Sequence, residues 1–168
     1  IGLIGVQAEL YPSMYALLND MQMPCEGDTL AEGIAVKIPG SFTSEVIRGL
    51  VDEIVLVSEA QLETAVSLLL QIEKTVVEGA GAAGLAAVMA HPEIFKGKNV
   101  GIVLCGGNID TRLLASVLTR SLVREKRITS IRIIGNVIDA DPGEDAGHEV
   151  RTVRRVARGR RRDEAHAG

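Results

Sequence analysis

The sequence predicts an α/β fold, a doubly wound and mainly parallel β-sheet with helices on both faces. Short aliphatic segments at residues 1–8, 53–57 and 98–104 alternate with segments of helical periodicity, a pattern typical of parallel sheets. Hydrophobic residues make up 46% of the chain, but aromatic residues only 2%. A core built from Val, Ile, Leu and Ala suits a sheet that is covered on both faces.

Composition also excludes several classes of partner. The chain has 168 residues and a formal net charge of −4, which gives no basis for a nucleic-acid partner. We expect no membrane partner, because no apolar run approaches the roughly 18 to 20 residues that a spanning helix needs and no signal peptide is visible. Two cysteines, Cys25 and Cys105, are too few for a disulfide framework and fit a reducing cytoplasm.

The first third of the chain predicts a strand, a helix and a loop. Residues 1–8 are expected to be a buried strand, and residues 13–21 a helix, since Pro12 is tolerated in a first helical turn. Residues 23–38 carry turn residues without a clear period, so we expect a loop. Ser41 or Thr43 can then cap a further helix over residues 45–51.

A short strand over residues 53–57 leads into a helix whose start is well specified. Ser58 and Gln61 have the spacing of a capping box, in which each side chain bonds the other's backbone N–H. The helix is expected to run to about Glu73, with one apolar face. That face comprises Leu62, Val66, Leu69 and Leu70.

A helix over residues 78–90 consists almost wholly of Gly and Ala. Its first two turns contain Gly79, Gly81 and Gly84, although glycine costs about 1 kcal/mol relative to alanine inside a helix. Close approach of a neighbouring backbone or a bound group would explain them. Glu78 stands just before this helix, where the N-terminal end of the dipole favours an ionised carboxylate.

Residues 98–104 are expected to form the central strand, because their aliphatic run is typical of burial on both faces. The run ends at Cys105, followed by Gly106 and Gly107 and then by an amphipathic helix over residues 110–124. Open α/β sheets bind ligands at the carboxyl ends of their strands, so Cys105 is a candidate site residue. The inward face of the helix would comprise Leu113, Leu114, Val117, Leu118 and Leu122.

Taken together, these segments resemble the threonine/serine dehydratases, which are pyridoxal-phosphate enzymes of the tryptophan-synthase-β-like fold. The similarity extends over about residues 4–127 and rests on five sequence blocks in the family's order. The blocks are residues 5–9, 29–33, 50–59, 78–88 and 98–110. The resemblance implies that the chain is the C-terminal part of such a catalytic domain. Because the chain starts at Ile1, inside a predicted strand, we expect it to be a fragment.

The resemblance implies a cofactor site. A Ser or Cys at the position of Cys105 faces the pyridine nitrogen in this family, and Gly106, Gly107 and Asn108 would shape the same wall. A thiol, with a reference pKa near 8.5, is a poor partner for a protonated pyridinium, so the ring nitrogen should stay neutral. A neutral ring withdraws fewer electrons, which favours β-elimination over reactions that need stronger withdrawal. Glu78 would lie beside the ring. The simpler alternatives are a small buried thiol without a role and an ordinary carboxylate at a helix start.

Two further carboxylates match family positions less closely. Glu9 corresponds to a carboxylate that helps bind a divalent cation in relatives such as serine racemase, but the second acidic residue of those sites falls here at Tyr15. A surface carboxylate is the simpler interpretation, and we expect no strong metal site. Glu32 and Gly33 stand where many dehydratases have Asp-Gly, in a loop near the active site.

The family's chemistry begins with a Schiff base between pyridoxal phosphate and a lysine in a Ser-Phe-Lys context, and no lysine of this chain has that setting. The lysines are Lys37, Lys74, Lys96, Lys98 and Lys126. We therefore predict no catalytic residue in this chain and no activity for it alone. The resemblance implies that the parent enzyme, expected to be a cytoplasmic homo-oligomer, converts L-threonine to 2-oxobutanoate and ammonia, or L-serine to pyruvate.

Three parts are expected along the chain: residues 1–127 from the catalytic domain, residues 128–143 resembling the start of an ACT regulatory domain, and an arginine-rich tail over residues 144–168. The tail contains seven arginines and no lysine. It can be a disordered basic segment or the product of a shifted reading frame in a GC-rich gene. Five interspersed acidic residues argue against a nucleic-acid-binding tail.

Several functions remain open at the level of sequence. The chain can be part of a threonine dehydratase, or of a related serine dehydratase or serine racemase. It can also be a non-catalytic α/β module that binds a small ligand at Cys105, although the glycine-rich phosphate loop that such a module needs is not visible. An inert gene fragment is the last alternative.

Overall fold

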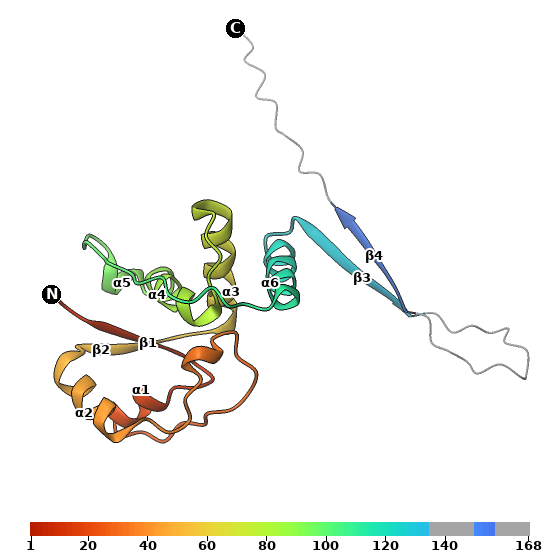
Figure 1. Ribbon diagram of the computed structural model, residues 1–168. Coiled ribbons are helices and arrows are strands. Elements are labelled where there is room, and N and C mark those ends of the chain that lie inside the picture. The colour runs from red at the N-terminus through yellow and green to blue at the C-terminus, as the bar shows by residue number, and fades with distance from the viewer. Residues whose placement is uncertain (135–149, 157–168) are drawn as a thin grey trace, which may run out of the picture. The chain divides into compact units, whose positions relative to one another are not determined.

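A computed structural model describes residues 1–134 and 150–156 (Figure 1). The chain divides into two compact units, Ile1–Leu118 and Thr119–Gly168. The first unit contains every candidate site residue. None of the described helices is both long enough and apolar enough to cross a bilayer.

A parallel pair of strands organises the first unit. β1 (Ile4–Ala8) and β2 (Glu53–Val57) run side by side, with Ile4 opposite Glu53 and Ala8 opposite Val57. Parallel strands need a long crossover connection, which here contains two helices. Both strands lie within the predicted segments, and the α/β class with parallel pairing is confirmed.

Helices cover both faces of this pair (Figure 1). α1 (Ser13–Leu18) and α2 (Ser41–Leu50) lie on one face, and α3 (Glu59–Leu68) and α4 (Gly79–Ala90) on the other. Shorter helical pieces connect them. These are the 3₁₀ turn η1 (Glu32–Ile34), the π-helix η2 (Leu69–Glu73) and α5 (Pro92–Phe95).

The predicted capping box is present at the start of α3. The Gln61 backbone N–H donates to Ser58 Oγ at 3.4 Å, and the Ser58 N–H donates to Gln61 Oε1 at 2.8 Å. The cap predicted for α2 is wrong. That helix begins at Ser41 with Gly40 as its N-cap residue. Because glycine has no side chain, no side-chain cap bond forms, and the Gly40 carbonyl accepts the Ser44 N–H at 2.9 Å as the first bond of the helix.

The hydrophobic core lies where α3 and α4 pack against the strands. Leu62 and Val66 of α3 are fully buried, as the apolar face predicts, whereas Leu70 is only half-buried. The core also contains Ala8 and Val57 from the strands and the alanines of α4. Burial of a side chain such as Leu62 is worth about 1.5–3 kcal/mol, so this layer stabilises the unit.

The predicted central strand is absent from its expected place. Residues 98–104 have no regular secondary structure, and Val103 is 83% exposed and Leu104 43% exposed. A strand buried on both faces needs a hydrogen-bonding neighbour on each side. In the described part of the chain, β1 pairs only with β2. A groove of about 960 Å³ lies between β1 and residues 98–103, so the expected neighbour is not supplied there.

The helix α6 (Thr111–Arg124) begins where the sequence predicts. Asp110 Oδ1 accepts the backbone N–H groups of Arg112 at 2.8 Å and Leu113 at 3.0 Å, which satisfies donors that a helix start leaves free. Of the predicted inward residues, Val117 is buried. The other four, Leu113, Leu114, Leu118 and Leu122, are half-buried.

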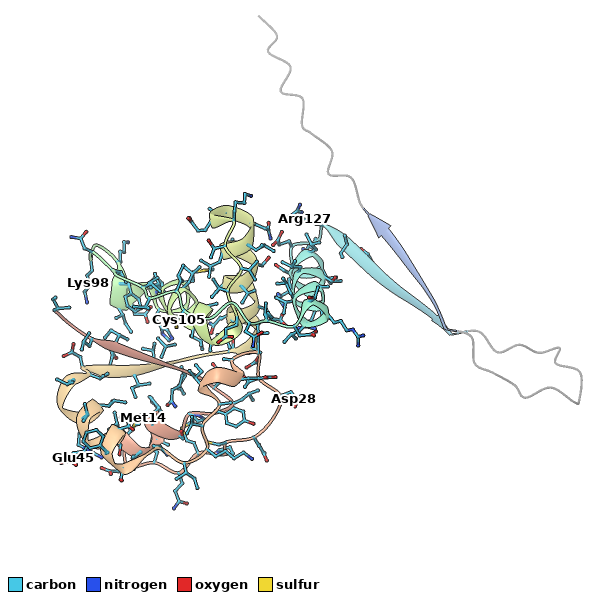
Figure 2. All side chains as sticks on the ribbon, viewed as in Figure 1. Met14, Asp28, Glu45, Lys98, Cys105 and Arg127 are labelled. Carbon is cyan, nitrogen blue, oxygen red and sulfur yellow. The ribbon has the colours of Figure 1, made fainter. Side chains whose placement is uncertain are left out.

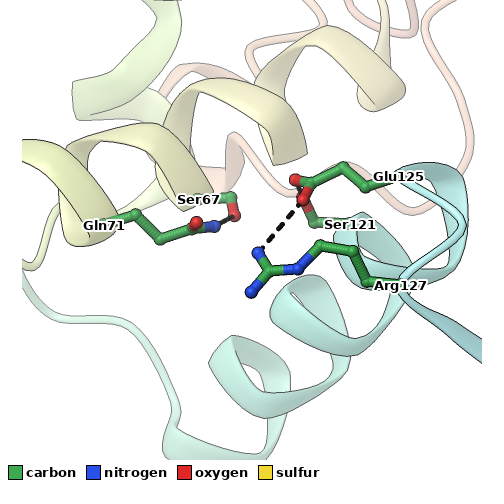
Figure 3. A network of polar contacts seen from close by, with 5 residues as sticks. All are labelled: Ser67, Gln71, Ser121, Glu125 and Arg127. Carbon is green, nitrogen blue, oxygen red and sulfur yellow. Dashed lines mark hydrogen bonds and ion pairs between the residues drawn. The ribbon is translucent and has the colours of Figure 1, made fainter. Parts of the chain in front are cut away.

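Polar contacts fix the ends of two helical segments (Figure 3). In η2, Gln71 Nε2 donates to Ser67 Oγ at 2.7 Å. At the C-terminal end of α6, Ser121 Oγ donates to Glu125 Oε1 at 3.1 Å, and Arg127 Nη1 pairs with Glu125 Oε2 at 3.2 Å. The Glu125 carboxylate therefore has two partners.

The second unit also contains an antiparallel strand pair. β3 (Ile128–Ile134) has the predicted bounds and pairs with β4 (Val150–Val156), with Ile128 opposite Val156. β4 lies inside the segment for which a disordered tail was expected. The predicted Asp-x-Pro-Gly turn at residues 139–143 falls outside the described residues, and the three-part division of the chain remains a prediction.

We expect the open edge of β1 and residues 98–104 to promote self-association, since unpaired strand edges template pairing with other chains. Val103→Lys should therefore lower the aggregated fraction of the purified chain at a given concentration. The matched control is Ile38→Lys, which adds the same charge at a site that is 85% exposed but lies outside the groove. Light scattering and gel filtration measure both variants. Equal improvement by the two would show that general hydrophobicity, rather than this edge, drives association.

Candidate cofactor-facing site

Three segments meet around one small cavity of about 330 Å³. They are the loop that leads into η1, the first turn of α4, and the segment between Cys105 and α6. Residues from all three line the cavity, including Glu32, Gly33, Glu78, Gly79, Asn108 and Asp110. Residues 29–33, with the sequence Thr-Leu-Ala-Glu-Gly, form the segment called the TLAEG loop below. Five of the positions predicted from sequence, two of them in this loop, therefore lie close together.

Glu78 joins the start of α4 to the glycine pair. Its backbone N–H donates to the Gly106 carbonyl at 3.0 Å, and its carboxylate is adjacent to the Gly106 Cα. Gly106 has a φ of +76°, a left-handed conformation that side chains rarely adopt. A Cβ at this position would also collide with Glu78 Oε1. Two independent constraints thus require glycine beside this carboxylate.

The glycines of α4 allow backbone to approach the helix directly. A Cβ at Gly79 would collide with the Leu30 carbonyl, and one at Gly81 with the Cys105 carbonyl. Close approach of neighbouring backbone was one explanation of the small-residue helix, and the structure confirms it. The start of α4 is therefore held between the TLAEG loop and the Cys105 segment.

Cys105 lies on the irregular segment between α5 and α6 (Figure 2). Its carbonyl packs against Gly81, while the residue as a whole is exposed. The cavity is lined by Glu78 and Asn108 but not by Cys105. The structure thus brings Glu78, Gly106 and Asn108 together, and the role of the thiol opposite a cofactor stays a prediction.

A carboxylate that the sequence analysis did not single out holds the TLAEG loop. Thr29 Oγ1 donates to Glu59 Oε1 at 2.6 Å, and the Leu30 N–H donates to Glu59 Oε2 at 2.7 Å. Glu59 is the first residue of α3. The only signal in the sequence is an acidic residue in a first helical turn, which is common for reasons of the helix dipole alone.

The cavity is rich in negative charge. Glu32, Glu78 and Asp110 line it, whereas no lysine or arginine of the described residues does. Like charges repel, so these carboxylates disfavour a phosphate group in this cavity and favour a neutral or positively charged one.

The structure offers little for a metal. Glu9 is exposed at the end of β1, where its backbone N–H donates to the Val57 carbonyl at 2.9 Å. Tyr15 uses its own N–H to bond Gln7 Oε1 at 2.8 Å. Within residues 1–134 and 150–156, no three His, Cys, Asp or Glu residues gather in a way that could hold a metal ion.

We predict opposite effects for alanine at two helical glycines. Gly81→Ala should destabilise the chain by about 1–3 kcal/mol, because the new methyl group would displace the Cys105 carbonyl. Gly49→Ala in α2, where no atom lies within 4 Å of the new Cβ, should instead stabilise it by about 0.5–1 kcal/mol. Urea denaturation followed by circular dichroism measures both. A stabilising Gly81→Ala would contradict the packing described above.

A protein family, curated relatives and solved structures match most of this chain. The family of pyridoxal-phosphate-dependent enzymes matches residues 1–106. L-threonine ammonia-lyase of Thermotoga maritima is 45% identical over 129 residues, which cover 76% of this chain and 32% of that protein. The chain therefore spans about a third of the length of this relative.

Solved structures agree. The crystal structure of a threonine deaminase from the organism abbreviated T.th. has a TM-score of 0.59 at 33% identity, covering 65% of this chain and 36% of that one. Processed threonine deaminase isoform 2 from Solanum lycopersicum has a TM-score of 0.63 at 28% identity, covering 73% and 35%. Since the family match includes β1, β2, α4 and the glycine pair's first member, the chain belongs to the family of pyridoxal-phosphate-dependent enzymes.

Proposed function

We propose that this chain forms the cofactor-facing part of a threonine dehydratase, which converts L-threonine to 2-oxobutanoate and ammonia by β-elimination. The observation that carries the proposal is the contact between the Glu78 carboxylate and Gly106, next to Cys105. The contact supports the proposal because the family resemblance assigns the segment around Gly106 to the cofactor ring. The matches to proteins named L-threonine ammonia-lyase and threonine deaminase support threonine as the substrate.

The residues present fit the ring side of pyridoxal phosphate. A volume of about 330 Å³ is at the lower end for small-molecule sites, and the missing side chains of Gly33 and Gly106 keep the space beside Glu78 open. Asn108 lines this cavity, whereas Cys105, Gly106 and Gly107 do not; these three would border the ring from the adjoining segment. The phosphate would bind outside this carboxylate-rich cavity.

Each of these groups has a limited chemical task. The cofactor, when bound, withdraws electrons from the amino-acid substrate so that its β-hydroxyl can leave. The Cys105 thiol is at most a weak hydrogen-bond partner for a ring nitrogen. The Glu78 carboxylate can orient a hydrogen-bond donor and can attract a substrate ammonium group.

We also propose that the parent enzyme is a cytoplasmic homo-oligomer that acts on threonine or serine, without nucleic-acid or membrane partners. Residues 128–143 would begin an ACT-like segment. A divalent cation near Glu9 would need ligands beyond the described residues, since no three-ligand group is present among them.

A chimera tests the assignment. Residues 1–127 would replace the matching third of the Thermotoga maritima L-threonine ammonia-lyase, with which this chain shares 45% identity over 129 residues. We expect a folded enzyme that retains pyridoxal phosphate after gel filtration and releases 2-oxobutanoate from threonine. Cys105→Ser should preserve activity, and Cys105→Leu should abolish it. A folded, cofactor-loaded chimera that produces no 2-oxobutanoate would refute the proposed function.

The isolated 168-residue chain should behave differently. We expect it to retain no pyridoxal phosphate after gel filtration and to release no 2-oxobutanoate, because none of its lysines has the family's sequence context. A visible absorption spectrum and a keto-acid assay measure this. A retained cofactor band together with product formation would show that the chain is catalytically complete by itself.

A further inference from the structure

We propose that Glu59 is a positioning residue, which fixes the loop over residues 29–33 and thereby sets one wall of the cavity beside Glu78. Glu59 does not itself line that cavity, so it acts through Thr29 and Leu30. The inference rests on the proposed function, since it concerns the geometry of the same site.

One carboxylate binds two consecutive residues of the loop and reaches a third through the Thr29 hydroxyl. Glu59 Oε1 accepts from Thr29 Oγ1 at 2.6 Å and Oε2 accepts from the Leu30 N–H at 2.7 Å. Thr29 Oγ1 in turn accepts the Ala31 N–H at 3.1 Å. Both carboxylate bonds are short and charge-assisted, the class that is stronger than neutral pairs. Thr29 is only 9% exposed and Ala31 fully buried, so little water competes.

The fixed loop touches the start of α4 at two points. The Leu30 carbonyl lies where a Cβ of Gly79 would be. A Cβ at Gly33 would lie 3.2 Å from Ala80 Cβ and 3.4 Å from Glu78 Oε1. A shift of this loop therefore changes the space around the Glu78 carboxylate and moves residues that line the cavity.

The carboxylate itself stands on a rigid support. Glu59 is the first residue of α3, directly after Ser58, which forms the capping box with Gln61. Its side chain lies at the positive end of the helix dipole, where a carboxylate is a favourable group. α3 is anchored by the buried Leu62 and Val66, so the loop is tied to the core and not to another loop.

Hydrogen exchange in the isolated 168-residue chain tests the anchor directly. Glu59→Ala should speed exchange of the Leu30 amide by about tenfold or more, because a bond to a charged acceptor is lost. Glu45→Ala, at an exposed position of α2, is the matched control and should leave that amide unchanged. If Leu30 exchanges at the wild-type rate in Glu59→Ala, the proposal is overturned.

Kinetics of the chimera test the effect on the site. Thr29→Val, which keeps the side-chain shape but removes the hydroxyl, should raise the KM for threonine by about tenfold, and Thr29→Ser should restore it to within about twofold. A purely structural defect would lower the folded fraction, and with it the maximal rate, at an unchanged KM. An unchanged KM in Thr29→Val, or no rescue by Thr29→Ser, would overturn the positioning role.

The two proposals can fail separately. A folded chimera without 2-oxobutanoate formation refutes the proposed function, and hydrogen exchange at Leu30 still decides whether Glu59 holds the loop. An active chimera whose Thr29→Val variant matches Glu45→Ala in KM leaves the proposed function intact and refutes the role of Glu59.

Discussion

The site depends on one packing constraint, the direct contact of α4 with two backbone carbonyls. The Leu30 carbonyl occupies the place of a side chain at Gly79, and the Cys105 carbonyl does the same at Gly81. Any larger residue would push one of these segments away. Leu30 lines the cavity, whereas Cys105 lies just before the segment that supplies Asn108 and Asp110 to it. The spacing of the two glycines therefore sets the distance between the TLAEG loop and the Cys105 segment.

Local signals in the sequence were sufficient for many elements. The bounds of β2, the capping box of α3 and the start of α6 at Asp110 depend on residues a few positions apart, and each was predicted. Long-range contacts could not be predicted in this way. The bond between Glu59 and Thr29 joins residues 30 positions apart, and nothing near Glu59 in the sequence distinguishes it from an ordinary carboxylate at a helix start.

Residues 98–104 show the limit of the strongest local pattern. Their aliphatic run predicts burial on both faces, but a strand forms only when hydrogen-bonding neighbours are present. In the described residues the edge of β1 facing the groove has no strand partner, and Val103 is exposed. The aliphatic composition of residues 98–104 therefore suits a buried strand, whereas their irregular conformation reflects the lack of a strand to pair with among the described residues. The matched region is about a third of the length of the Thermotoga maritima relative.

The distribution of charge indicates that different segments of the complete enzyme would bind the ring and the phosphate of the cofactor. A cavity with Glu32, Glu78 and Asp110 and no lining cation among the described residues cannot balance a phosphate. Under the proposed function, the cavity would face the uncharged side of the ring and the ammonium group of the substrate. The contacts to the cofactor phosphate would then come from positively charged or amide-rich segments outside this cavity. Glu59 fits the same logic, since its charge is used by Thr29 and Leu30 and shapes the cavity without adding a fourth carboxylate to it.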